Sequence, residues 1–222
     1  KRARLATMKP ALLVVEGPYL RDILDQPRAL DATFQGLDEP EALAAIARRL
    51  HGGELKRVVL TGMGSSHHGL VPLHLRLVEA GLAPVTVESS ELLHYQQALL
   101  AEGTLLVLLS QSGRSAEILR LLETVRGRGV VTLALTNTAD SPLAREATAT
   151  VLTHAGEEAT VSCKTYLAAQ MALAWLGEVL ASGDVAAARG ALQAAIPGVA
   201  EYLASWRAHV EWLAERLQGV RA

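Results

Sequence analysis

The sequence has 222 residues, half of them hydrophobic, a formal net charge of −2 and one cysteine. This length suits one domain with a full core and some additional helix. No apolar stretch approaches the ~20 residues of a membrane span, no long basic run supports nucleic-acid binding, and Cys163 alone excludes an internal disulfide. We therefore expect a cytoplasmic protein that acts on neither membrane nor nucleic acid.

The first elements are helical. The basic run at residues 1–4 precedes Met8, and we expect residues 1–15 to be an N-terminal arm or an expression remnant. Gly17-Pro18 opens a short helix that should stop before Pro27, because proline has no N–H to donate. A second helix should begin at residues 38–40, with proline in its first turn, and end at residues 52–53.

Strand and helix signals then alternate from residue 57 to residue 153. The strand-like runs are almost wholly apolar, as expected for strands buried on both faces of a parallel, doubly wound sheet. They cover residues 57–61, 85–87, 104–109, 130–136 and 149–153, and a helix reaching about residue 80 follows the first of them. C-terminal helices should occupy residues 162–181, 184–195 and 198–217, with Pro197 as a joint.

Two polar corners follow the first and third strands. One is Gly62-Met63-Gly64-Ser65-Ser66, and the other is Ser110-Gln111-Ser112-Gly113-Arg114-Ser115. Ligands of doubly wound sheets bind outside the carboxyl ends of the strands, where helix N-termini favour anions. Hydroxyl and amide donors could therefore cradle a phosphate there. The alternative is helix capping alone, for which one serine would suffice.

The corners do not match the two common phosphate-binding motifs. No Walker A run exists in the sequence. The run that begins at Gly62 starts like a dinucleotide-binding fingerprint, but His67 stands where its third glycine belongs. A dinucleotide site would also leave the second corner unexplained, so a dinucleotide-binding domain stays a remote alternative.

The same stretches resemble a known family. They are similar to the SIS (sugar isomerase) domain, and most closely to the first SIS domain of glucosamine-6-phosphate synthase-like isomerases and deaminases. The S-Q-S-G-x-[ST] corner is the most specific match. The matching stretches are residues 25–30, 61–66, 89–91, 109–115 with Glu117, Asn137 and 155–166.

The resemblance implies a three-layer α/β/α fold with a five-stranded parallel sheet in flavodoxin-like order, in a domain over residues 16–183. Residues 184–222 would form C-terminal helices, which in the double-domain relatives lead into a second SIS domain. It also implies a site that needs no metal and no other cofactor. The residues implied for the phosphate are Ser66, Ser110, Gln111, Ser112 and Ser115, and those for the sugar are Gly64, Ser65, Thr160 and Val161.

Two departures from the family pattern affect the site. Residues 155–164 are one residue shorter than the pattern, so the choice between Thr160 and Val161 stays open. Arg114 replaces an acidic residue, and we expect its side chain to point to solvent.

The implied function is aldose–ketose isomerisation, or the related deamination, of an (amino)sugar phosphate through an enediol(ate). In double-domain relatives the proton-moving glutamate and the ring-opening histidine belong to the second SIS domain, and a lysine comes from the C-terminal tail. No catalytic base can therefore be named among these residues. A non-catalytic phosphosugar-binding or sensor module is the alternative. Apolar helices around residues 171–180 and 206–213 suggest a homodimer, although contact with a further domain would explain them equally.

Other chemically active side chains have ordinary explanations. His67 and His68 follow the first corner and could act as acid or base, but surface packing is the preferred interpretation. The remaining histidines are scattered, so no metal site is expected. Lys164 begins a helix, where a positive charge is disfavoured by the helix dipole. Its resemblance to the family lysine implies a buried ion pair, with Glu157 or Glu158 as the expected partner, and Schiff-base chemistry is the less favoured alternative.

Overall fold

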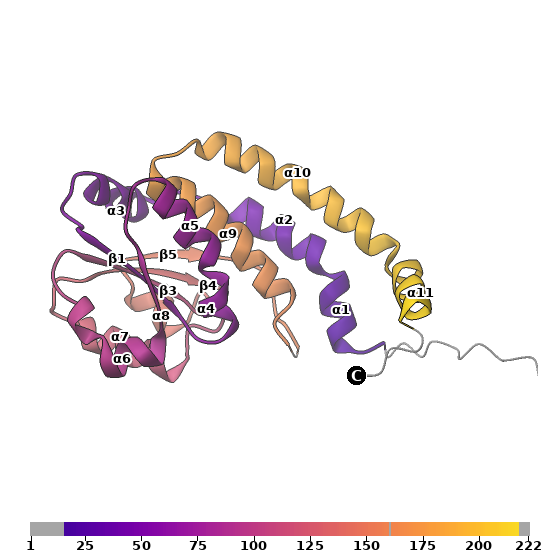
Figure 1. The fold of residues 1–222 in the computed structure, drawn as a ribbon, viewed down its shortest axis with the longest axis horizontal. Helices are drawn as coiled ribbons and strands as arrows, with labels where there is room; N and C mark the ends of the chain where they lie inside the picture. The colour runs from indigo at the N-terminus through magenta and orange to yellow at the C-terminus, as the bar shows by residue number, and fades with distance from the viewer. Residues whose placement is uncertain (1–15, 160, 218–222) are drawn as a thin grey trace, which may run out of the picture.

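The computed structural model describes residues 16–159 and 161–217. Five parallel strands form one sheet in the order β2-β1-β3-β4-β5 (Figure 1). Their bounds are β1 (Arg57–Gly62), β2 (Val85–Glu88), β3 (Thr104–Leu109), β4 (Val131–Thr136) and β5 (Ala149–Leu152). The predicted parallel sheet and its flavodoxin-like order are confirmed, and each strand lies within one or two residues of its predicted range.

Helices cover both faces of the sheet and make a three-layer domain (Figure 1). Each face of the sheet has its own hydrophobic core. Leu106 of β3 and Ile118 belong to one core, and Leu105 of β3 and Trp175 belong to the other. Side chains of a strand alternate between faces, so the wholly buried β3 supplies both cores. The first face carries α6 (Ser89–Tyr95), α7 (Ala116–Val125) and α8 (Pro142–Glu146), and the second carries α3 (Glu41–His51), α5 (Val71–Glu79) and α9 (Lys164–Ala181).

Helix α9 is the central helix of the second face. Twelve of its 18 residues are buried, because it packs on the sheet and against α2, α5 and α10. A helix apolar on nearly every side is expected in such a place. Residues 171–180 are therefore covered within this chain, which removes them as evidence for a subunit interface.

Proline accounts for two differences from the predicted helices. α1 (Pro18–Leu24) ends before Pro27 as predicted, but α2 (Gln26–Gly36) then starts with Pro27 in its first turn, where no N–H is required. The helix predicted to run to about residue 80 is divided into α4 (Ser65–Gly69) and α5, because Pro72 cannot donate to the preceding turn.

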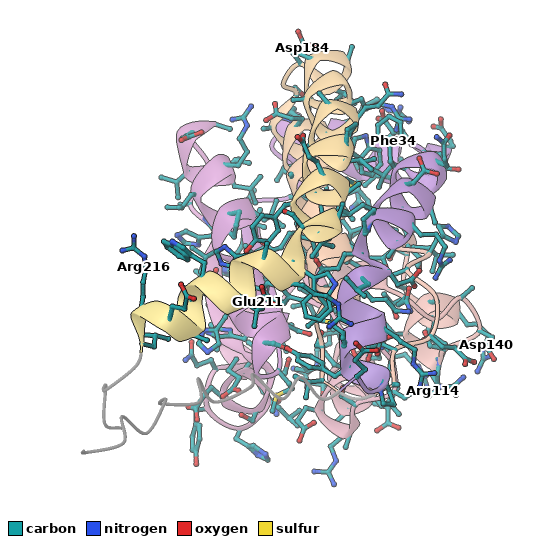
Figure 2. All side chains as sticks on the ribbon, turned by 90° about the vertical axis from the view of Figure 1, so that its right-hand side faces the viewer. Phe34, Arg114, Asp140, Asp184, Glu211 and Arg216 are labelled. Atoms are coloured by element: carbon teal, nitrogen blue, oxygen red, sulfur yellow. The ribbon has the colours of Figure 1, made fainter. Side chains whose placement is uncertain are left out.

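The predicted joint at Pro197 is wrong. α10 (Val185–Ala204) continues through Pro197, and the break comes at Ser205, before α11 (Trp206–Arg216). Proline removes one hydrogen bond from the ladder, but Gln193, whose carbonyl loses that bond, is exposed and can bind water. α10 crosses α2 and α9, and α11 leaves it at an angle (Figures 1 and 2).

A short 3-10 helix, η1 (Gln97–Leu99), completes the elements of the described ranges. Within those ranges, no helix combines the length and apolar character needed to cross a membrane.

Candidate functional site

Strand register brings the two polar corners together. β1 and β3 are neighbours in the sheet. Gly62, the last residue of β1, pairs with Leu109, the last residue of β3, so the two strands end side by side. A Cβ on Gly62 would lie 3.0 Å from the His67 amide nitrogen and from the Leu109 carbonyl oxygen. Only glycine permits the first corner to pass so close to β3.

The second corner is a tight turn in which Ser110 is buried and Ser112 and Ser115 are partly exposed. Ser110 is 4% exposed, its N–H donates to the Leu135 carbonyl at 3.1 Å, and its Oγ accepts from the Gly113 N–H at 3.2 Å. The Ser115 Oγ lies 3.3 Å from the Ser110 Oγ. A left-handed φ of +60° at Gly113 closes the turn. The sheet and the backbone of the turn thus fix the positions of these hydroxyls.

Helix capping does not explain these serines. Ser115 is the N-cap residue of α7, but its side chain makes no capping hydrogen bond. The N-cap residue of α4 is Gly64, which has no side chain, so Ser65 and Ser66 lie inside that helix and not at its cap. The Ser112 Oγ accepts from the Arg114 N–H at 3.3 Å, and its own O–H stays free to donate. The corners therefore offer neutral O–H donors beside two helix N-termini, an arrangement suited to an anion.

A small pocket lies where the corners meet the end of the sheet. It measures about 20 Å³ and adjoins an open polar hollow of about 530 Å³, with which it shares Gln111 and Asn137. The smaller pocket has room for about one water, so a sugar ring would have to lie outside it. Its polar lining residues are Ser65, Ser66, Gln111, Thr136, Asn137, Thr153, Ser162, Thr165 and Tyr166.

The structure places three of the candidate residues of the site along these two hollows. Ser65, Ser66 and Gln111 line the pocket. Ser110, Ser112 and Ser115 line neither hollow, although they belong to the same turn as Gln111. The Gly64 N–H points to the Glu88 carboxylate at 3.4 Å. Val161 is 63% exposed, while Thr160 lies outside the described residues.

Ser162 and Thr165 were missed as lining residues of the pocket. They follow the predicted sugar-contacting positions, and their hydroxyls lie 3.0 Å apart. The prediction treated them only as part of a helix start, whereas the turn into α9 places both in the lining of the same pocket as Ser66 and Gln111.

The Arg114 side chain points away from the proposed phosphate cradle, which is the space between the two serine corners. Its guanidinium is half exposed and lies 3.4 Å from the Asp140 carboxylate, and Figure 2 shows the pair at the rim of the molecule. The predicted orientation of Arg114 toward solvent is confirmed. Neutral donors are left to bind any anion in the cradle.

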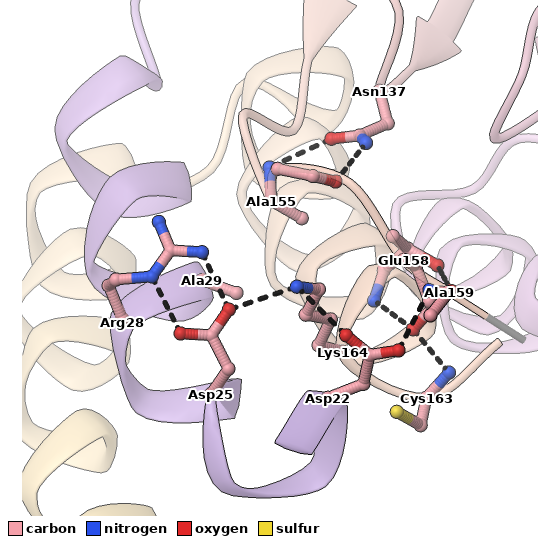
Figure 3. Close-up of polar contacts among 12 residues, drawn as sticks. Asp22, Asp25, Arg28, Ala29, Asn137, Ala155, Glu158, Ala159, Cys163 and Lys164 are labelled. Carbon is pink, nitrogen blue, oxygen red and sulfur yellow. Dashed lines mark hydrogen bonds and ion pairs between the residues drawn. The ribbon is translucent and has the colours of Figure 1, made fainter. Parts of the chain in front are cut away.

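The predicted ion pair of Lys164 is wrong in its partners. Lys164 is 5% exposed, and its Nζ lies 3.1 Å from Asp22 and 2.9 Å from Asp25, not beside Glu157 or Glu158 (Figure 3). Burial would lower the pKa of Lys164, but the hydrogen bonds to both aspartates outweigh it and raise that pKa. The acids come from the N-terminal helices, more than 130 residues away in the chain.

Glu158 instead caps α9. Its carboxylate accepts from the Cys163 N–H at 2.8 Å, and from the N–H and hydroxyl of Thr165. Burial opposes the charge on Glu158, but these hydrogen bonds outweigh it and lower its pKa. Burial also raises the pKa of the Cys163 thiol to about 11, so this thiol stays protonated at neutral pH.

The two histidines after the first corner pack edge to face, with ring centroids 5.5 Å apart. The Nδ1 of His67 is buried without a hydrogen-bond partner in the described part of the chain. In residues 16–159 and 161–217, no group of three or more His, Cys, Asp or Glu side chains could hold a metal ion.

Comparison with known proteins points to one family. The family model described as SIS domain matches residues 54–176. The glutamine–fructose-6-phosphate aminotransferase [isomerizing] of Symbiobacterium thermophilum is 36% identical over 213 residues, which cover 90% of this chain and 35% of that protein. The chain thus spans about a third of the length of this curated relative.

Solved structures show the same fold. A proposed phosphosugar isomerase from Silicibacter pomeroyi is 28% identical, with a TM-score of 0.66 over 85% of this chain and 56% of that chain. The C-terminal domain of the glucosamine-fructose-6-phosphate aminotransferase from Francisella tularensis is 22% identical, with a TM-score of 0.68 over 92% of this chain and 58% of that chain.

Proposed function

The chain belongs to the SIS domain family, and on this premise we propose that it binds a phosphorylated sugar. Its phosphate would accept hydrogen bonds from Ser66, Ser110, Gln111, Ser112 and Ser115, and its sugar would lie along Gly64, Ser65, Thr160 and Val161. The observation that carries the proposal is the convergence of two hydroxyl-rich corners at adjacent strand ends, where no serine side chain makes a capping hydrogen bond to α4 or α7.

We further propose that the chain takes part in aldose–ketose isomerisation, or deamination, of an (amino)sugar phosphate. A phosphate held at one end leaves the C1–C2 end positioned for proton transfer through an enediol(ate). The names of the relatives, an isomerizing aminotransferase and a proposed phosphosugar isomerase, support this class of reaction. The protein would act in the cytoplasm, as a homodimer, with residues 16–183 as its sugar-binding domain.

A phosphosugar-binding or sensor module without catalysis is the second candidate. The state of Glu158 favours it, because this acid near the site is bound by three donors as a helix cap and has a lowered pKa. A carboxylate so engaged is a poor proton acceptor.

Titration with a panel of sugars tests the binding proposal. Calorimetry would compare fructose 6-phosphate, glucosamine 6-phosphate, ribose 5-phosphate and unphosphorylated fructose. We expect only phosphorylated sugars to bind. Ser112→Ala should weaken their binding about tenfold, because it removes a hydrogen bond to a charged group. Ser205→Ala, at an exposed position on the far C-terminal helices, is the control. Equal binding of fructose, or equal loss in both variants, would contradict the proposal.

An isomerase assay on each sugar that binds then separates the two candidates. Turnover supports the enzyme, and tight binding without turnover supports the module.

A further inference from the structure

The loop between β5 and α9 is held by side chains from outside the loop. After β4, Asn137 accepts from the Ala155 N–H and donates to the Gly156 carbonyl, both at 2.8 Å. From α1, Asp22 accepts from the Ala159 N–H at 2.8 Å. Figure 3 shows both anchors, with Asn137 at the Ala155 end of the loop and Asp22 at Ala159. The path of the loop therefore depends on two elements far from it in sequence.

Asp22 connects that loop to a cluster of four charges, of which Asp22 and Lys164 are buried. Its other carboxylate oxygen lies 3.1 Å from the Lys164 Nζ, and the same Nζ lies 2.9 Å from Asp25. Arg28 donates two hydrogen bonds of 2.6 Å to Asp25. The two negative charges of the aspartates are thus balanced by the two positive charges of Lys164 and Arg28. The ammonium at the first residue of α9, where the helix dipole opposes a cation, is neutralised.

Packing alone does not account for Asp22. It is the one residue that α1 buries, at 6% exposure, and burying a carboxylate costs several kcal/mol unless its partners compensate. An apolar residue would bury α1 at lower cost. What Asp22 supplies, and an apolar side chain could not, is an acceptor for the loop amide together with a partner for Lys164.

The far end of the same loop faces the candidate site. Ser162 lines the pocket with Ser66 and Gln111, and Val161 is largely exposed. Asp22 itself does not line that pocket. Its carboxylate therefore acts on any bound sugar only indirectly, through the Ala159 N–H and through Lys164 at the start of α9.

We propose that Asp22 is a positioning residue for the sugar end of the site, because it fixes the Ala159 amide and the start of α9. The inference rests on the proposed sugar-phosphate function. The phosphate end is set by the sheet and by the two corners, so it does not depend on Asp22. A change at Asp22 should alter sugar recognition while leaving phosphate recognition intact, which a general loss of stability would not do.

NMR titrations of the full chain with fructose 6-phosphate and with inorganic phosphate test this separation. We expect Asp22→Ala to weaken fructose 6-phosphate about tenfold, since displacement of contact groups has effects of this order or larger. Inorganic phosphate should change by less than about twofold. Asp25→Ala removes one partner of Lys164 but leaves the bond from the Ala159 N–H to Asp22 in place, so it should weaken fructose 6-phosphate less than Asp22→Ala does and leave inorganic phosphate within about twofold. Asp31→Asn, an exposed acid on α2, is the surface control.

The outcomes distinguish the two proposals. If the wild-type chain does not bind fructose 6-phosphate, the proposed function fails and this inference fails with it. If the wild type binds but Asp22→Ala weakens both ligands equally, or neither, only the inference is overturned.

Asp22→Leu keeps the test open if the alanine variant does not fold, because leucine is close in size to the native side chain and, unlike asparagine, offers no acceptor for the Ala159 N–H. Hydrogen exchange at the Ala159 amide should then be about tenfold faster than in the wild type, with fructose 6-phosphate bound at least about threefold more weakly. Unchanged exchange and unchanged affinity would overturn the inference.

Discussion

Gly113→Ala should destabilise the protein through a specific contact within the phosphate cradle. Gly113 has a φ of +60°, and a Cβ there would lie 2.3 Å from the Ser141 Oγ, which accepts the capping bond from the Ala144 N–H of α8. A left-handed alanine costs about 1 kcal/mol. Displacing the capping hydroxyl costs about 1 kcal/mol more, so the free energy of unfolding should fall by about 2 to 3 kcal/mol.

Urea unfolding with a matched control isolates the contact. Gly127 has a φ of +75° and nothing within 4 Å of its Cβ position, so Gly127→Ala should cost about 1 kcal/mol. Ser141→Gly removes the opposing side chain at a cost of a few tenths of a kcal/mol, roughly that of glycine at an N-cap. Gly113→Ala in that background should then cost no more than Gly127→Ala. The reasoning is refuted if the two alanine variants are equally destabilised, or if Ser141→Gly brings no relief.

Three further results are expected. Arg114→Ala should change phosphate affinity by less than about threefold, because its guanidinium pairs with Asp140 at the surface; a tenfold loss in titration would place that charge in the site. Asn137→Ala should lower the free energy of unfolding by about 2 kcal/mol, because the fully buried Ala155 loses the acceptor of its N–H; wild-type urea midpoints would contradict this. The hydrogen bond from Arg28 lowers the pKa of Asp25 to about 2, so its contribution is complete above about pH 4 and is lost as pH falls toward 2. Between pH 5 and pH 2.5 the free energy of unfolding of Asp25→Asn should therefore fall by about 1 kcal/mol less than that of the wild type. An equal fall in both proteins would refute the assignment.

The sheet was predictable because its signal is local. Strands buried on both faces are continuous apolar runs, and the all-buried β3 matches its predicted range of residues 104–109. Helix ends were harder where proline was involved. Pro27 was interpreted as a stop, yet it also suits the first turn of α2, and only the packing of α2 against α9 decides between the two.

The two serine corners could be predicted for a related reason. Parallel strands align their carboxyl ends at one edge, so residues that follow β1 and β3 must converge there. The partners of Lys164 had no such signal. Its unfavourable place at a helix start indicated a need for acids, but nothing in the sequence specified that Asp22 and Asp25 supply them across the fold.

A crystal structure of the chain soaked with fructose 6-phosphate tests the central claim most directly. The account predicts phosphate oxygens within about 3 Å of the hydroxyls of Ser66, Ser110, Ser112 and Ser115, with the sugar extending toward Val161. A phosphate bound anywhere other than between the two serine corners would contradict it.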